Sequence, residues 1–157
     1  MKNQLSLVLL VSISLYLPLS YAETAQDLFL AAIQGKQQRV QNILTQGIDV
    51  NSKISGERTA LMAAANSGNY HTIKLLLAYG ADVNMSDKQG ITALMDAVMF
   101  GNEKIVQLLI TAGADVNAKD VKDISVLDKA NTMSYKPLIT LLEAAGATKT
   151  EKEATTE

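Results

Sequence analysis

Small and apolar residues return at every 33rd position along most of this chain. One series of leucines is Leu28, Leu61, Leu94 and Leu127, and one series of alanines is Ala31, Ala64, Ala97 and Ala130. Glycines keep the same interval at Gly47, Gly80, Gly113 and Gly146, without insertions or deletions. A fixed period of this size is typical of a solenoid, in which similar units stack on one another.

One unit, residues 87–119, shows the elements that each repeat is expected to form. A polar turn ends at Gly90, and Thr92 is a residue type that caps the start of a helix. Two short helices are predicted over 93–100 and 103–111, with a glycine and an asparagine between them. The pattern therefore predicts an all-α solenoid of helix-turn-helix units joined by hairpin-like turns.

The second helix of this unit carries an apolar stripe. Val106, Leu109 and Ile110 follow the spacing of one helix face. Gly113 stands where the helix must end in a left-handed conformation. Two short helices bury little surface alone, so we expect stability to come from the interfaces between units as well.

The loops and helix starts repeat two short motifs. Gly-Ala-Asp-Val-Asn occurs at 80–84 and 113–117 with a close variant at 47–51, and Thr-Ala-Leu-Met occurs at 59–62 and 92–95. With these motifs the chain resembles the ankyrin repeat family over about residues 24–149. The family has Thr-Pro-Leu-His where this chain has Thr-Ala-Leu-Met, so any Thr–His hydrogen bond of the family is absent here. Glu57 replaces the turn glycine found at Gly90, and we expect a different hairpin there.

The resemblance implies four ankyrin repeats within residues 23–148, with approximate bounds 24–53, 54–86, 87–119 and 120–148. We expect the outer two to act as caps. Thr24 with Asp27 suits a helix start, Ser134 replaces the glycine between helices, and Pro137 fits the opening turn of the last helix. Glu143 stands where other units have Leu or Ile, as an outward-facing last helix requires. Residues 149–157 are predicted to be a disordered polar tail.

Residues 1–22 lie outside the repeat and are predicted to be a secretory signal peptide. Lys2 precedes an apolar run over 5–17, Pro18 ends the run, and small residues precede a cleavage site after Ala22. An uncleaved anchor is the alternative, but a membrane-spanning helix needs about 20 apolar residues. We expect a periplasmic protein of a Gram-negative bacterium, without stable membrane insertion after cleavage; secretion beyond the envelope is the alternative location.

Composition narrows the function. The chain has no cysteine and one histidine, His71, so we predict no catalytic residues, no metal site and no cofactor. Two pairs of aspartates, Asp82 with Asp87 and Asp115 with Asp120, lack the spacing of a calcium loop. Without Lys2 the formal net charge is −3, and the lysines are scattered, so nucleic acid is not an expected partner.

Ankyrin folds usually bind a partner protein on the concave side, formed by turn tips and first helices. Carried over by position, this implies a candidate set of Arg58, Asn66, Lys88, Ile91, Met99, Phe100 and Met133. Phe100 and the two methionines would be apolar anchors, or they fill gaps between neighbouring helices. Asp96 is expected to be a solvated residue or to rim the patch.

We therefore predict a monomeric, non-enzymatic module that binds another protein. A secreted effector that binds a host protein is the alternative. A small enzyme or metal protein and a self-associating structural unit are further hypotheses.

Overall fold

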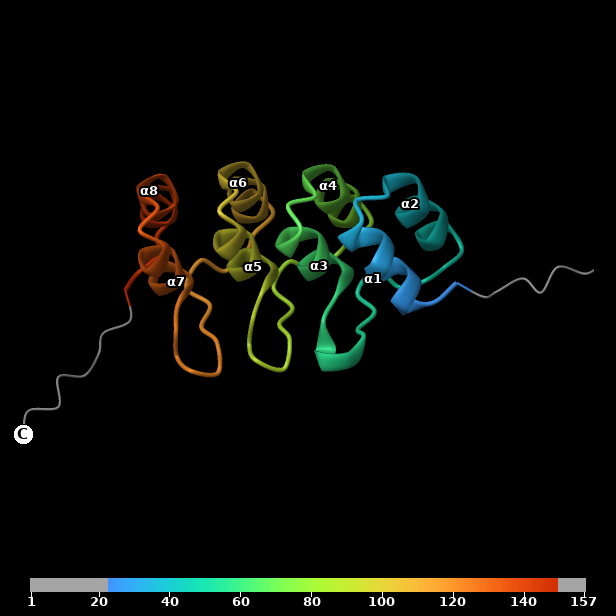
Figure 1. The fold of residues 1–157 in the computed structure, drawn as a ribbon, viewed down its shortest axis with the longest axis horizontal. Helices are drawn as coiled ribbons and strands as arrows, with labels where there is room; N and C mark the ends of the chain where they lie inside the picture. The colour runs from blue at the N-terminus through green and yellow to red at the C-terminus, as the bar shows by residue number, and fades with distance from the viewer. Residues whose placement is uncertain (1–22, 150–157) are drawn as a thin grey trace, which may run out of the picture.

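The computed structural model describes residues 23–149, which form eight α-helices arranged as four stacked pairs (Figure 1). The helices are α1 (Ala25–Ile33), α2 (Gln37–Thr45), α3 (Ala60–Asn66), α4 (Tyr70–Ala78), α5 (Ala93–Phe100), α6 (Glu103–Thr111), α7 (Val126–Met133) and α8 (Lys136–Ala144). The predicted helices of the third unit have the predicted bounds. The predicted signal peptide and all but the first residue of the predicted tail lie outside the described residues.

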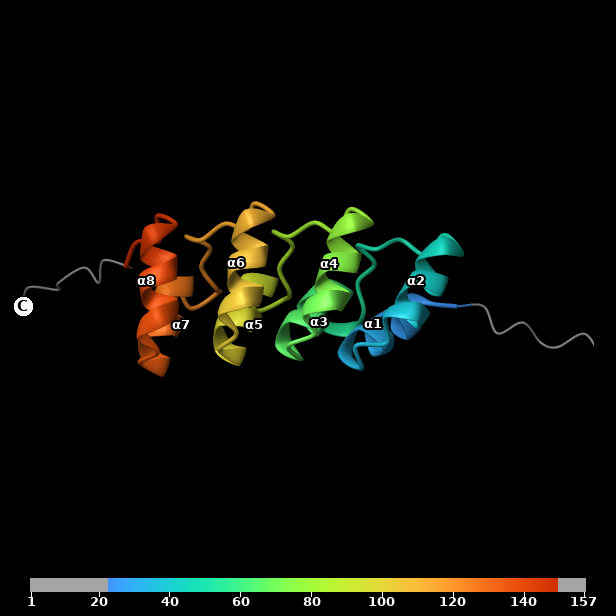
Figure 2. The same cartoon turned by 90° about the horizontal axis from the view of Figure 1, so that it is seen from above.

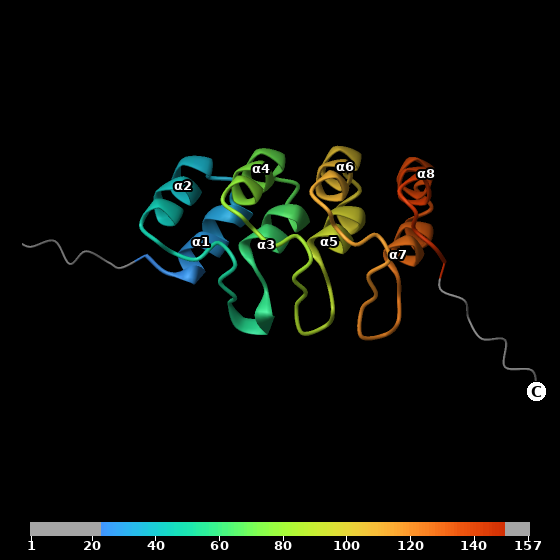
Figure 3. The same cartoon turned by 180° about the vertical axis from the view of Figure 1, so that it is seen from behind.

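The helices form two layers. The first helices of the units, α1, α3, α5 and α7, pack side by side, and the second helices, α2, α4, α6 and α8, form the other layer (Figures 1 and 2). Three hairpin-like loops project from the side of the first helices, as Figure 3 shows from behind. Within residues 23–149 these loops contain isolated bridges but no strand. The hairpins and first helices together form what we call the inner surface.

Hydroxyl side chains start the first helices. The Thr92 hydroxyl accepts a hydrogen bond from the Met95 amide at 3.3 Å, as the sequence predicts, and Thr59 caps α3 in the same way. Thr24 and Ser125 each form a capping box, in which an aspartate three residues later bonds back to the cap. Helices α3, α5 and α7 therefore begin at equivalent positions, and α1 begins two residues earlier in its own unit.

The core lies between the two layers, and it corrects one detail of the predicted stripe on α6. Val106 and Leu109 are buried as predicted, but Ile105 is buried as well and Ile110 is only half-buried. The buried stripe is therefore centred about one residue earlier than the sequence spacing indicated. On α8, Glu143 is exposed, as expected of a capping helix.

The period-33 glycines end the second helices in the left-handed region, with φ between 84° at Gly80 and 93° at Gly47. Residues other than glycine also take this conformation in the hairpins and at one helix end. Glu57 has φ 64° and Asp123 φ 60°, so both adopt the conformation of the equivalent Gly90, with φ 75°. The hairpin of the second unit differs from that of the third in its short 3-10 turn, where Gly56 also has a positive φ of 80°. Ser134, between α7 and α8, has φ 55°.

Asparagines link the loops of neighbouring units. Asn84 Oδ1 accepts from the Asp115 amide at 2.8 Å, and Asn84 Nδ2 donates to the Gly113 carbonyl at 3.1 Å. Asn51 and Asn117 make the equivalent pairs of bonds one unit earlier and one unit later. We call each pair of bonds an asparagine clasp. The clasps place each unit in the same register against the next one.

Candidate functional site

Exposed apolar side chains gather in the last turns of the first helices. Five residues make up this group, which we call the apolar edge: Leu30, Ile33, Met99, Phe100 and Met133. Met99 is 54% exposed, Phe100 51% and Met133 39%. In the second unit the equivalent place is polar, and Asn66 is exposed there. Since the first helices stack side by side, their last turns form one row across the stack (Figure 1).

Two side chains of the apolar edge, Phe100 and Met133, lie against the preceding unit. A side chain at Gly68, in the turn between α3 and α4, would collide with the Phe100 ring. Met133 lies less close to its neighbour, because its Cε atom would be 4.0 Å from a Cβ at Gly101, an ordinary contact distance. Both residues therefore contact a neighbour, as a gap-filling role requires, yet leave a large share of their surface in solvent, as an anchor requires. Their part in partner binding stays a prediction.

The other predicted residues lie at the opposite end of the first helices. Lys88 is exposed and Ile91 half-buried in the hairpin of the third unit, before the start of α5. An eight-residue helix is about 12 Å long, so these two side chains are separated from Met99 and Phe100 at its far end. The candidate set thus divides into a hairpin group and the apolar edge.

Arg58 is engaged in the fold itself. Its guanidinium bonds to the Asp87 carboxylate at 2.9 Å and to the Asp96 carboxylate at 2.6 Å, linking the hairpin of the second unit to the third unit. Only 26% of the Arg58 side chain is exposed. These ion pairs leave little of the guanidinium for a partner.

The expectation that Asp96 is solvated, or rims a patch, is wrong. Asp96 is 8% exposed because Arg58 reaches over it from the preceding hairpin. Burial raises the pKa of Asp96 to about 6, against the lowering effect of Arg58. In the fourth unit Lys129 bonds to Asp120 at 2.6 Å. Burial opposes the charge of Asp120, but this bond and two backbone amides hold its pKa below the ordinary value.

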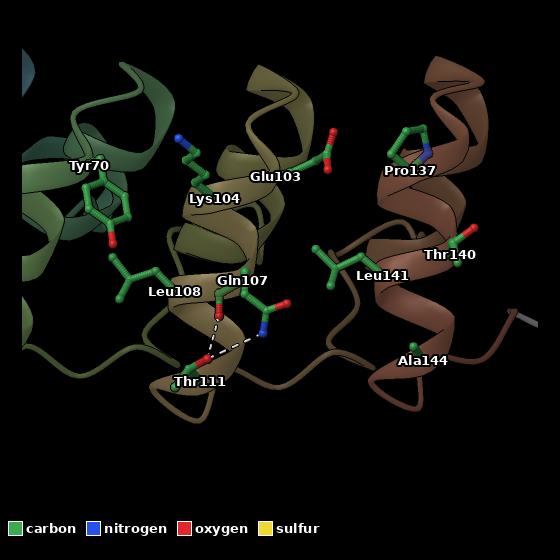
Figure 4. A pocket seen from close by; sticks show the side chains of 10 residues that line it. All are labelled: Tyr70, Glu103, Lys104, Gln107, Leu108, Thr111, Pro137, Thr140, Leu141 and Ala144. Atoms are coloured by element: carbon green, nitrogen blue, oxygen red, sulfur yellow. Dashed lines mark hydrogen bonds between the residues drawn. The ribbon is translucent and has the colours of Figure 1, made fainter.

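A groove that the sequence did not reveal lies on the layer of second helices. It is an open groove of about 760 Å³ between α6 and α8 (Figure 4). Leu108 and Leu141 give it apolar surface, and Lys104 and Glu103 lie near its upper end. The Tyr135 hydroxyl donates to Glu103 at 2.5 Å, and this bond raises the pKa of Tyr135.

Comparison with known proteins identifies the stack. A family model described as ankyrin repeats in three copies matches residues 28–120, more than half of the chain. The chain belongs to the ankyrin repeat family. A search among curated proteins gave no significant match. Ankyrin repeats typically bind other proteins and are generally not enzymes, so this fold is that of a protein–protein interaction module.

The ankyrin stack also accounts for residues whose chemistry the sequence left open. His71 is exposed at the start of α4, and its ring meets Tyr70 edge-on with centroids 5.5 Å apart. Asp82 and Asp115 accept hydrogen bonds from amides in their own loops. Within residues 23–149, acidic and histidine side chains do not gather in threes as a metal site would need. In the same range, the helices lack the length and apolar character needed to cross a membrane.

Proposed function

We propose that this protein is a non-enzymatic binding module of the periplasm that holds a partner protein against its inner surface. The apolar edge is the observation that carries the proposal. Its members occupy places that other units fill with polar residues, as Asn66 does, so the repeat does not require apolar side chains there. Methionine and aromatic residues are enriched in the centres of protein interfaces.

The mechanism is recognition by a rigid surface. The Phe100 ring packs against Gly68, where a side chain would collide with it, so the ring has a fixed neighbour before a partner binds. A partner that covers Phe100 and Met99 gains about 25 cal/mol for each Å² of apolar surface removed from water. Exposed polar residues such as Asn66, with Lys88 on the hairpin, supply the polar rim.

The test is a capture experiment with tagged protein that starts at Glu23, on periplasmic extract. Phe100→Asp places a charge in the centre of the apolar edge and is expected to abolish capture of the partner. Tyr79→Asp is the matched control, because Tyr79 is also an exposed aromatic residue (39%). Tyr79 lies outside the apolar edge, at the C-terminal end of α4. Tyr79→Asp is expected to capture the partner as the wild type does.

The captured protein is then purified, and its affinity is measured directly for the wild type and both variants. Circular dichroism establishes that Phe100→Asp keeps its helices. A partner that binds Phe100→Asp and wild type equally would refute the role of the apolar edge. Collapse of the helices in Phe100→Asp would show that Phe100 belongs to the core.

The periplasmic location rests on residues 1–22 and is tested by cell fractionation. We expect the processed chain, beginning at Glu23, in the periplasmic fraction. Recovery mainly from the culture medium would favour the second candidate, a secreted effector that binds a host protein through the same surface. Light scattering is expected to give the mass of a monomer; a dimer mass would point to a self-associating structural unit.

A further inference from the structure

The methionines of residues 23–149 differ in how far they are exposed. Met62 and Met95 occupy equivalent places in the core and are 1% and 0% exposed, and Met85, in the loop after α4, is half-buried. Met99 and Met133 are the exposed ones, and both belong to the apolar edge. Reagents dissolved in water therefore reach these two side chains most readily.

Both exposed methionines lie next to Phe100, one along the chain and one in the stack. Met99 precedes it in the last turn of α5, and Met133, at the end of α7, is the equivalent of Phe100 in the fourth unit. The Met133 Cε atom would be 4.0 Å from a Cβ at Gly101, the residue that follows Phe100. A change in polarity at either methionine therefore acts beside the aromatic residue of the apolar edge.

A polar side chain is compatible with the fold at both places. Asn66 and Thr132 occupy the place of Met99 in the second and fourth units, and both are exposed. Ser67 occupies the place of Met133 in the second unit. The stack therefore does not require an apolar side chain at either place, and a reaction that makes the two methionines polar is expected to leave it folded.

Methionine undergoes one reaction with mild oxidants that makes it polar. Its sulfur lone pair attacks an oxygen of a hydroperoxide, so that an S–O bond forms while the O–O bond breaks. The hydrogen on the transferred oxygen passes to the leaving oxygen, which departs as water or an alcohol. Sulfur is oxidised by two electrons and the peroxide is reduced by two. The product is a polar sulfoxide, which sulfoxide reductases convert back to methionine. Since the chain has no cysteine, no thiol within it competes for the oxidant.

We propose that Met99 and Met133 are sites of reversible oxidation by hydroperoxides, and that their sulfoxides convert the apolar edge to a polar surface. A sulfoxide oxygen accepts hydrogen bonds from water and loses them beneath an apolar partner. Oxidation therefore weakens any contact that covers the two side chains. The sites themselves follow from exposure, whereas the effect on a partner rests on the function proposed above.

Oxidation of purified protein of residues 23–157, which contains the whole described stack, tests the two sites. The protein is treated with graded hydrogen peroxide, and mass spectrometry of its peptides gives the oxidation rate of each methionine. Met99 and Met133 are expected to react about tenfold faster than Met62 and Met95, because susceptibility follows exposure. Protein unfolded in urea is the reference and is expected to show similar rates at all four. Similar rates in the folded protein as well, or faster reaction at Met62 or Met95, would overturn the proposal.

Retention on a phenyl column measures the polarity of the surface without a partner. Oxidised wild type, freed of peroxide, is expected to elute earlier than untreated protein and to regain its original retention after treatment with sulfoxide reductases. Circular dichroism is expected to show that both forms keep their helices. Unchanged retention, no recovery or loss of the helices would each overturn the proposal.

Two sets of variants assign the change in retention to the apolar edge. The double variant Met99→Leu with Met133→Leu lacks both sites, and its retention is expected not to respond to peroxide. Met85→Leu is the matched control, because it removes a methionine outside the edge, and it is expected to respond as the wild type does. A double variant that responds as the wild type does would overturn the assignment.

The captured partner separates this inference from the proposed function. Its affinity for oxidised wild type is expected to be about tenfold lower than for untreated protein, the effect of burying one unpaired polar group. The double variant, compared with its own untreated form, is expected not to respond. Unchanged affinity for oxidised wild type, with Phe100→Asp still defective, would overturn the inference and leave the proposed function standing. If Phe100→Asp binds normally, the proposed function fails, and oxidation rates and column retention alone decide whether the two sites exist.

Discussion

Two junctions of the stack differ in their charges although their backbones are arranged alike. One joins the second unit to the third, and the other joins the third unit to the fourth. At the first junction Arg58, from the second unit, neutralises Asp87 and Asp96 of the third. At the second junction Ile91 stands in place of the arginine. Lys129 stands in place of Asp96 there, and it neutralises Asp120 within the same unit.

The two arrangements solve the same problem, since Asp87 and Asp120 each cap their own hairpin loop through two backbone amides. Their charge needs a cation, and the cation comes from a neighbour in one case and from the same unit in the other. Only the first arrangement makes the ionic interaction part of the interface between units. The second and third units are therefore expected to be coupled more strongly by charge than the third and fourth.

Arg58→Met tests the stronger junction and has the largest expected effect. It leaves Asp96 buried without its partner, and removal of one member of a buried ion pair costs about 3–5 kcal/mol of unfolding free energy. Urea unfolding measures the loss. Lys53→Met is the control, because Lys53 forms an exposed pair with Glu57 in the same hairpin and is expected to cost under about 1 kcal/mol. Equal losses for the two variants would contradict the comparison.

The pH dependence of stability tests the same junction. The pKa of Asp96 is about 6 in the folded protein and 3.8 ordinarily, so the folded state binds the proton more tightly. Stability from this group is therefore greatest below about pH 4 and falls by roughly 3 kcal/mol as the pH rises through 6. The measurement is the unfolding free energy between pH 4 and 7.

Asp96→Asn is the control for this titration, since it removes the ionisable group. The stability of the wild type relative to Asp96→Asn is expected to decline with rising pH. Arg58, Asp87 and Lys129 are the charged groups that act on Asp96. In Arg58→Met the decline is expected at higher pH, because the lowering effect of the guanidinium is lost. A difference that does not change with pH would refute this assignment.

Gly90→Ala tests how closely the hairpins of the third and fourth units approach each other. An alanine Cβ would lie 3.0 Å from the Asp120 Cα atom, in a backbone with φ 75°, and we expect a loss of about 2 kcal/mol. Gly56→Ala is the control, since Gly56 has φ 80° but no atom within 4 Å of such a Cβ. Its loss, from backbone strain alone, is expected to be about half as large. Equal losses in urea unfolding would show that the approach is not tight.

Lys129→Met has the smallest expected effect, about 1.5 kcal/mol, because Asp120 keeps its two amide bonds. Adding Ile91→Arg to this variant transfers the arrangement of the first junction to the second. We expect the double variant to regain much of the lost stability in urea unfolding. No recovery would show that the two junctions differ in backbone geometry and not only in their charges.

Local signals predicted most of the fold. Thr92 begins a helix through its own hydrogen bond, and the period-33 glycines end helices because glycine adopts the left-handed conformation. The bounds of α5 and α6 therefore follow from residues close by in the sequence. Part of the apolar edge could also be predicted, because Met99 and Phe100 replace the polar residues that the second unit has at the same positions. Leu30 and Ile33 were not among the predicted residues. How far these side chains are exposed depends on how the units stack, which the sequence does not show.

The missed features depend on contacts between distant residues. Arg58 and Asp96 are 38 positions apart and meet only when two units stack, so no local pattern indicates a buried Asp96. Alignment of the units draws attention to Arg58, since the equivalent residues of the next two units are Ile91 and Ile124.

The asparagine clasps set a rule for how such a chain can change length. Each clasp joins an asparagine to a loop about one period further on, as Asn84 does with Gly113 and Asp115. A single insertion would pull the two halves of a clasp out of alignment, whereas a duplicated whole unit brings its own asparagine and receives the previous one. The number of units can therefore change only by whole units, and duplication of a gene segment of that size would leave every asparagine clasp intact.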